Sequence, residues 1–229
     1  MTLPGSSRQY WLPATLVLAL CPAVHAAEGP SGQGQSAQGQ AAETTAPGSA
    51  VQSLEATLAQ TRSMHALVTQ LVMDQDGREL QENQVVMQMQ KPASFSWEIT
   101  EPYNELMVTD GYTIWRYEPD LDQVTIARFN NDLDRTPVML LNGDAASIAA
   151  AYEVSEAVMD DGNLRFVLQP LGPGSLFERM SLTFTGTQLR EMQFEDSLGQ
   201  QTSLSFDAVE QNLPIGSEQF TFNPPAGVD

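Results

Sequence analysis

The chain has few residues of the kinds that catalysis and metal binding usually require. Its 229 residues include one cysteine, Cys21, and two histidines, His25 and His65. There is no histidine pair, cysteine cluster, GxSxG motif or phosphate-binding glycine loop. His65 stands alone near the apolar face of an expected helix, where a histidine is more often a core or capping residue than a ligand. The sequence therefore predicts a protein that is not an enzyme, with no catalytic residues, no metal site and no cofactor.

Positive charge is also scarce. Ten lysines and arginines stand against 29 aspartates and glutamates, and only one of the ten, Lys91, is a lysine. So acidic a surface repels nucleic acid and the anionic faces of membranes, which excludes nucleic acid as a partner. It also keeps a protein soluble, and we expect a monomer.

The N-terminus has the features of a secretory signal peptide. Arg8 precedes a short apolar run that ends near Leu20, and Val24-His25-Ala26 forms a small-residue cleavage site. The run is too short to span a bilayer. Cys21 follows a leucine, where a lipidated cysteine is normally preceded by glycine or alanine. We therefore expect residues 1–26 to be a signal peptide, cleaved after Ala26 to release a soluble periplasmic protein without cysteine.

Composition divides the remainder of the chain in two. Residues 27–50 consist mostly of glycine, serine, glutamine and alanine and contain no large apolar residue. Such a segment cannot bury enough surface to offset its ordering entropy, which predicts a disordered tether. Residues 51–229 are then expected to form a single domain of ordinary size.

Alternation of apolar and polar residues dominates this domain. After a helix over residues 51–63, hairpins are expected around Asp76-Gly77 and Asp110-Gly111, dipeptides that tolerate positive φ in tight turns. Residues 136–151 indicate two short helices, and alternating segments follow to the end. The pattern predicts about ten antiparallel strands and three helical pieces, a mainly β fold.

One residue interrupts the apolar face of its strand. Residues 85–97, VVMQMQKPASFSW, read as one strand whose odd positions are apolar except for Lys91. The simplest explanation is that its stem lies on the apolar surface and its ammonium group reaches water.

Each expected strand has one apolar face, so the sheet curls over something apolar. This could be an ordinary core or a cavity. The helices expected are too few to cover so many strands, which favours a cavity. Methionines from Met64 to Met192 suit a surface that repacks around variable apolar ligands.

A remote alternative is a periplasmic hydrolase that uses a carboxylate pair, such as Glu98 with Glu101 or Asp132 with Asp134. Acidic pairs are expected by chance in a chain this acidic.

Several motifs together resemble one family. KPASFSW, LMVTDGYTIWRYEPDLDQVT, TPVMLL, RFVLQP and the ending FTFNPPAGV are similar, in order and spacing, to the LolA family of periplasmic lipoprotein carriers. The resemblance implies an incomplete, curved antiparallel half-barrel with helices lidding an apolar concave cavity. It also implies acylated lipoproteins as cargo, the inner-membrane LolCDE complex as donor and the outer-membrane receptor LolB as acceptor.

The resemblance also assigns a role to Lys91, while the apolar faces of the expected strands indicate which side chains would line the cavity. Lys91 occupies the position of an arginine that latches the lid helices in the family. The side chains expected to line the acyl-chain cavity are Met87, Met89, Phe95, Trp97, Leu106, Val108, Trp115, Phe166, Leu168, Met180, Phe184, Met192 and Phe194. Phe95 is expected at the cavity entrance.

Two related functions remain open. One is a lipid-sensing regulator of the RseB or MucB type, which normally carries a second domain, whereas this chain ends at Asp229. The other is a LolB-like receptor, which would be lipidated.

Overall fold

The structure, a computed structural model, describes residues 47–129, 140–141, 145–172, 175–225 and 227. In this part of the chain, eleven strands form one antiparallel sheet. The strands are β1 (Ser63–Met73), β2 (Glu79–Gln90), β3 (Ser94–Glu101), β4 (Glu105–Thr109), β5 (Thr113–Glu118), β6 (Gln123–Arg128), β7 (Tyr152–Val158), β8 (Leu164–Pro170), β9 (Phe177–Thr185), β10 (Gln188–Asp196) and β11 (Gln201–Gln211). The helices are α1 (Pro47–Ala59), α2 (Ala145–Ala151) and the 3-10 helices η1 (Pro119–Leu121) and η3 (Ser217–Phe220).

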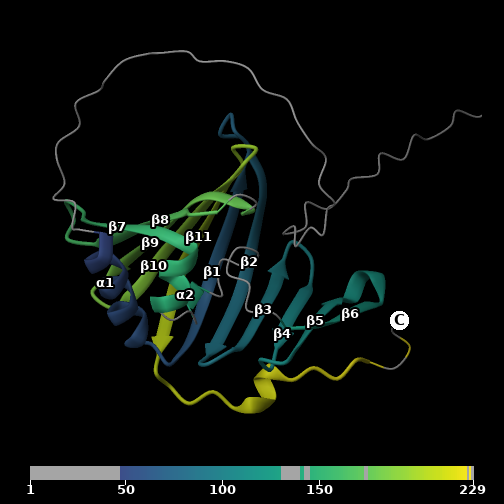
Figure 1. Ribbon diagram of the computed structural model, residues 1–229. Coiled ribbons are helices and arrows are strands. Elements are labelled where there is room, and N and C mark those ends of the chain that lie inside the picture. The colour runs from purple at the N-terminus through teal and green to yellow at the C-terminus, as the bar shows by residue number, and fades with distance from the viewer. Residues whose placement is uncertain (1–46, 130–139, 142–144, 173–174, 226, 228–229) are drawn as a thin grey trace, which may run out of the picture. The chain divides into compact units, whose positions relative to one another are not determined.

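The sheet is open. Its strand order is β6-β5-β4-β3-β2-β1-β11-β10-β9-β8-β7, so β6 and β7 are its two edges. In Figure 1, strands β7 to β11 curl over α1 and α2, while β3 to β6 extend away from them. The expected mainly β, incompletely closed barrel is confirmed, with eleven strands in the described residues where about ten were predicted.

Helix α1 begins earlier than the sequence indicated. It starts at Pro47, a residue whose fixed φ suits the first helical turn, so residues 47–50 are not part of a tether. Ala50, Leu54 and Leu58 follow one another at intervals of four and are all buried. The helix ends at Ala59, and Thr61 lies beyond it. No helix among the described residues has the length and hydrophobicity needed to cross a membrane.

The segment expected as one strand over residues 85–97 is a hairpin. Strand β2 ends at Gln90, residues 91–93 form a turn, and β3 begins at Ser94. Met89 pairs with Phe95 and Met87 with Trp97 across the hairpin. Directly opposed residues of antiparallel strands share a face, so the odd-numbered side chains stay together although the chain reverses. The missed reversal accounts for the extra strand.

The register divides the sheet into two faces. The inner face is the one that α1 and α2 cover, and the outer face is its opposite. Apolar side chains of the inner face pack with Leu54 of α1 and Ile148 of α2 into one continuous core. Ser53 Oγ of α1 also donates a hydrogen bond of 2.9 Å to Glu156 of β7, an edge strand. Both helices are thus docked over the interior of the curl.

The C-terminal segment after β11 covers part of the outer face. Helix η3 contacts β3, and its Phe220 is buried. Phe222 packs on Tyr117 of β5 with ring centroids 5.3 Å apart. In Figure 1 this segment runs in yellow beneath β3 to β6. The aromatic residues of the C-terminal motif are therefore packing residues of the outer face.

Candidate functional site

Ten of the side chains predicted to line a cavity lie together on the inner face. All are buried, and all belong to the core that includes the helices. They are Met87, Met89, Phe95, Trp97, Phe166, Leu168, Met180, Phe184, Met192 and Phe194. They come from both halves of the sheet, and the strand register brings them onto one surface. Their contact with acyl chains stays a prediction.

Leu106, Val108 and Trp115 were assigned to the wrong face. Val108 pairs with Trp115 and with Ser96, whose neighbours Phe95 and Trp97 point inward. Because successive side chains of a strand alternate, these three residues point outward. Val108 is buried, but it does not belong to the inner core.

On β4 and β5, the residues that do face inward, Met107 and Ile114, were not predicted. Met107 lies opposite Trp97 and is buried in the core. Ile114 lies opposite Thr109 and packs against the same core. Strand β4 carries three consecutive apolar residues, so its alternation did not show which side faces inward.

Phe95 does not stand at an exposed entrance in this conformation. It is 1% exposed and stacks on Trp97, with ring centroids 6.1 Å apart. Its cross-strand partners are Met89 and Thr109, both buried. The predicted placement at a mouth is wrong for this conformation, because the ring is buried in the core of the inner face.

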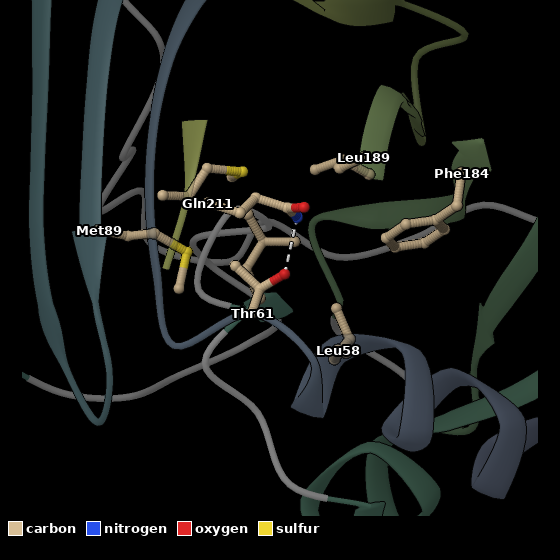
Figure 2. A pocket seen from close by; sticks show the side chains of 8 residues that line it. Leu58, Thr61, Met89, Phe184, Leu189 and Gln211 are labelled. Carbon is tan, nitrogen blue, oxygen red and sulfur yellow. Dashed lines mark hydrogen bonds between the residues drawn. The ribbon is translucent and has the colours of Figure 1, made fainter. Parts of the chain in front are cut away.

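A small apolar pocket lies where the end of α1 meets the sheet. Figure 2 shows Leu58, Met89, Phe184 and Leu189 around it. The remaining lining residues are Thr61, Met64, Leu141 and Gln211. Its volume open to water is about 10 Å³, roughly the room that one water molecule needs. An acyl chain needs far more space, so α1 or neighbouring side chains must move before this pocket can take one.

Lys91 binds the end of α1 at Leu58, a residue that lines this pocket. Its Nζ atom donates a hydrogen bond of 2.8 Å to the carbonyl oxygen of Leu58, and its backbone N–H donates to the carbonyl oxygen of Arg62 at 2.8 Å. The last turn of α1 contains no basic residue of its own. A cation is favourable there because the carbonyl groups of a helix end carry partial negative charge. Lys91, in the β2–β3 turn, thus supplies the positive charge that the last turn of α1 lacks.

Burial limits the strength of this contact. The ammonium group is half-buried, and the loss of its hydration lowers the pKa of Lys91 from its usual 10.5. A charge-assisted hydrogen bond contributes about 1.5–3 kcal/mol. The desolvation that lowers the pKa opposes this contribution. The net free energy by which the bond stabilises the position of α1 is therefore below that range.

The junction between α1 and β1 is fastened separately by the end of β11. Asn212 accepts a hydrogen bond from the Arg62 N–H at 2.8 Å and donates one to the Gln60 carbonyl at 2.9 Å. Gln211 Nε2 donates to Thr61 Oγ1 at 2.8 Å, the dashed line in Figure 2. These bonds fix the point where the helix leaves the sheet, whereas Lys91 and Ser53 bind the helix itself.

Polar side chains interrupt the apolar inner face near the β1–β2 hairpin. Asn83 Nδ2 donates to Gln70 Oε1 at 3.1 Å, and both residues are almost fully buried. Gln81 Nε2 donates to Asn83 Oδ1 and to the Tyr103 hydroxyl, each at 2.8 Å. These four residues, Gln70, Gln81, Asn83 and Tyr103, form a polar rung across the inner face. The sequence analysis did not predict these contacts.

The inner face is also charged beyond this rung. Arg116 Nε donates to Glu105 Oε1 at 2.8 Å, and its Nη2 lies 3.3 Å from Glu118 Oε1. The hydrogen bond to Glu105 is the largest cause of the raised pKa of Arg116. Burial raises the pKa of Tyr103 nearby. The apolar surface is therefore bounded on the β3–β5 side by polar and charged groups.

His65 and the carboxylate pairs form no recognisable catalytic arrangement in the described part of the chain. His65 lies on β1 and not on a helix, with Nδ1 3.9 Å from Glu210 Oε2. Glu98 and Glu101 are exposed on β3, and a register shift between them places both opposite outer-face residues of β2, Val86 and Gln84, away from the inner face. Asp132 and Asp134 lie outside the described residues. Within the described residues no three His, Cys, Asp or Glu side chains are grouped as metal ligands.

Comparison with known proteins gives one consistent result. Residues 59–223 match the profile of the family described as outer membrane lipoprotein carrier protein LolA. The outer-membrane lipoprotein carrier protein of Hahella chejuensis is 38% identical over 185 residues, which cover 80% of this chain and 88% of that protein. The protein of the same name from Chromohalobacter salexigens is 36% identical over 178 residues, covering 78% and 84%.

One solved structure supports the fold alone. An uncharacterized conserved protein from Thermus thermophilus shares 13% identity and superposes with a TM-score of 0.50, over 77% of this chain and 95% of that chain.

Proposed function

The chain belongs to the LolA family of outer membrane lipoprotein carriers, and we propose that it shields the acyl chains of lipoproteins on its inner face while carrying them through the periplasm. In this proposal the LolCDE complex of the inner membrane supplies the lipoprotein and the receptor LolB of the outer membrane accepts it. The role needs no catalysis and no cofactor.

The observation that carries the proposal is the continuous apolar inner face, against which helix α1 packs. Methionine and aromatic side chains from strands on both sides of β1 form one surface. Across it, α1 makes polar contacts through Leu58 with Lys91 and through Ser53 with Glu156. A cover of this kind can be displaced by acyl chains, which then replace the apolar contacts that the helix loses.

Energetics explain why the inner face is closed by its own side chains. The three acyl chains of a lipoprotein anchor contain roughly 45 methylene groups, worth on the order of 35 kcal/mol if fully buried. Net affinities saturate near roughly −20 kcal/mol. Loading of this carrier must therefore separate α1 from the sheet, and that cost lowers the net affinity to a value from which release is possible.

Processing at the N-terminus is part of the proposal. Cleavage after Ala26 yields a mature, unlipidated periplasmic protein that begins at Ala27. Intact-mass analysis of envelope fractions decides this point, because a diacylglyceryl adduct on Cys21 would indicate a membrane-anchored receptor instead.

The direct test of the function is release of lipoproteins from spheroplasts. Spheroplasts labelled with radioactive palmitate are incubated with the purified mature protein. We expect labelled lipoprotein in the supernatant, in a complex that co-elutes with the protein. Labelled lipoprotein that stays in the membrane fraction, under conditions in which an authentic LolA releases it, would contradict the proposal.

A further inference from the structure

The indole nitrogen of Trp97 is a buried hydrogen-bond donor that lacks an acceptor in the described part of the chain. Trp97 is 5% exposed, and no described residue accepts a hydrogen bond from its Nε1 atom. Its opposite neighbours on β2 and β4 are Met87 and Met107, and its ring stacks on Phe95. These side chains offer no oxygen acceptor. Among the described residues, this donor thus has apolar neighbours.

Such a donor is costly. Buried tryptophan nitrogens usually find a partner, and an unsatisfied buried donor costs about 1–3 kcal/mol. Phenylalanine at this position would fill similar apolar space without that cost. The donor is available to any ligand that brings an acceptor to the inner face.

Resting on the function proposed above, we infer that the Trp97 indole donates a hydrogen bond to a carbonyl of the linkage between acyl chains and their headgroup. Hydrocarbon chains carry no acceptor, so the first acceptors near them are the ester or amide carbonyls at their origin. A carbonyl that follows its chain onto the inner face loses its bonds to water. Trp97 replaces one of them, and both groups are satisfied only in the loaded form.

This arrangement makes Trp97 a specificity-determining residue. It favours acylated ligands, whose linkages carry carbonyls, over ether-linked or alkyl ligands of the same length. The discrimination equals one net hydrogen bond, which corresponds to about five- to tenfold in affinity. The sulfur atoms of Met87 and Met107 are weak acceptors and do not compete strongly.

The test compares three synthetic lipopeptides, of which the first two differ only at the linkage and the third adds an amide-linked chain. One has two hexadecyl ether chains and a free amine, the second has two palmitoyl esters and a free amine, and the third has the two ether chains and an N-palmitoyl amide on the amine. Affinities are measured by competition with an apolar dye for the mature protein, for Trp97→Phe and for Trp115→Phe. Trp115 is the matched control because it lies on the outer face.

If the acceptor is an ester, the wild-type protein and Trp115→Phe should bind the diester about five- to tenfold more tightly than the diether with a free amine. If the acceptor is the amide, their affinity for the third lipopeptide should exceed that for the diether by more than the added chain contributes, and the excess should again be about five- to tenfold. In Trp97→Phe that gain disappears. Persistence of the gain in Trp97→Phe, or its absence in the wild type, would overturn the inference but leave the carrier function standing. Failure of the wild type to bind any of the three would contradict the carrier function itself.

A second measurement does not depend on the Trp97→Phe variant folding. After loss of the signal peptide only two tryptophans remain, Trp97 and Trp115. In ¹⁵N spectra, the Trp97 indole proton should shift downfield on loading with the carbonyl ligand that binds more tightly, and not with the diether. Trp115→Phe assigns the two signals. Equal shifts with all ligands would contradict a hydrogen bond to the linkage.

Discussion

The Nζ atom of Lys91 lies 2.8 Å from the carbonyl oxygen of Leu58, so the only lysine of the chain binds the end of the helix that covers the inner face. This bond joins the β2–β3 turn to α1 and exists in the closed form. If α1 moves on loading, the bond is lost, and lipid binding must supply its free energy.

Replacement of Lys91 tests this latch. Lys91→Leu removes the bond to α1 and adds apolar surface, so the loaded form should gain up to about tenfold in affinity over the empty one. Uptake should persist, while transfer to purified receptor should slow because closure no longer favours release. Lys91→Arg keeps the charge and should transfer like the wild type. Equal transfer rates for Lys91→Leu and wild type would show that the bond to Leu58 does not act as a latch.

The pH dependence of stability provides a separate test of the buried ammonium. Because burial lowers the pKa of Lys91 below 10.5, the unfolded chain binds more protons than the folded one between the lowered value and 10.5. The free energy of unfolding contributed by Lys91 should therefore rise with pH through that window and stay constant below it. Urea unfolding of wild type and Lys91→Leu between pH 8 and pH 10.5 measures this. The wild type should gain on the variant, and parallel curves would indicate an exposed ammonium.

Phe95 tests the role of the inner face in loading. Phe95→Glu places a charge among buried apolar side chains and should abolish uptake of lipoprotein from spheroplasts. Because Phe95 is buried in the closed form, the variant should also unfold several kcal/mol more easily, which urea titration measures. Phe95→Leu is the matched control and should retain uptake. Normal loading by a folded Phe95→Glu would show that acyl chains avoid this part of the inner face.

The polar rung should contribute to stability. Asn83→Leu leaves Gln70 Oε1 without the donor it has in the wild type, a loss of about 1–3 kcal/mol in the free energy of unfolding. Gln88→Leu changes a residue of the same strand on the outer face and should stay within about 0.5 kcal/mol of the wild type. Urea titration compares the two, and an Asn83→Leu variant as stable as Gln88→Leu would argue against a structural rung.

The sequence predicted the strands well where a turn dipeptide such as Asp-Gly marked the hairpin. Asp74 Oδ1 accepts bonds from the N–H groups of Asp76 and Arg78, and Gly77 has φ +76°, as expected for the first hairpin. The reversal at residues 91–93 was missed because Met89 and Phe95 stay on one face on either side of it. Alternation alone cannot distinguish a continuous strand from a hairpin in which the odd-numbered residues of both strands lie on the same face.

The candidate site was predictable only in part. Lys91 stood out as a charge in an apolar series, but its acceptor is a backbone carbonyl of Leu58, which no side-chain pattern shows. Val108 and Trp115 were placed inward because they are apolar. Their face is decided by pairing with Ser96. The segment around Phe220, about a hundred residues later, covers that side of the sheet.

The central claim of the proposed function is that the inner face of the sheet meets the acyl chains. A photo-crosslinking residue, p-benzoylphenylalanine, is placed at Met89 on the inner face in one variant and at Trp115 on the outer face in another. Both variants are loaded with lipoprotein carrying radioactive palmitate, irradiated, and stripped of uncrosslinked lipid. If the acyl chains lie on the inner face, the variant at Met89 should give a labelled adduct and the variant at Trp115 should give none. Label attached only at Trp115, or equally at both positions, would contradict this claim.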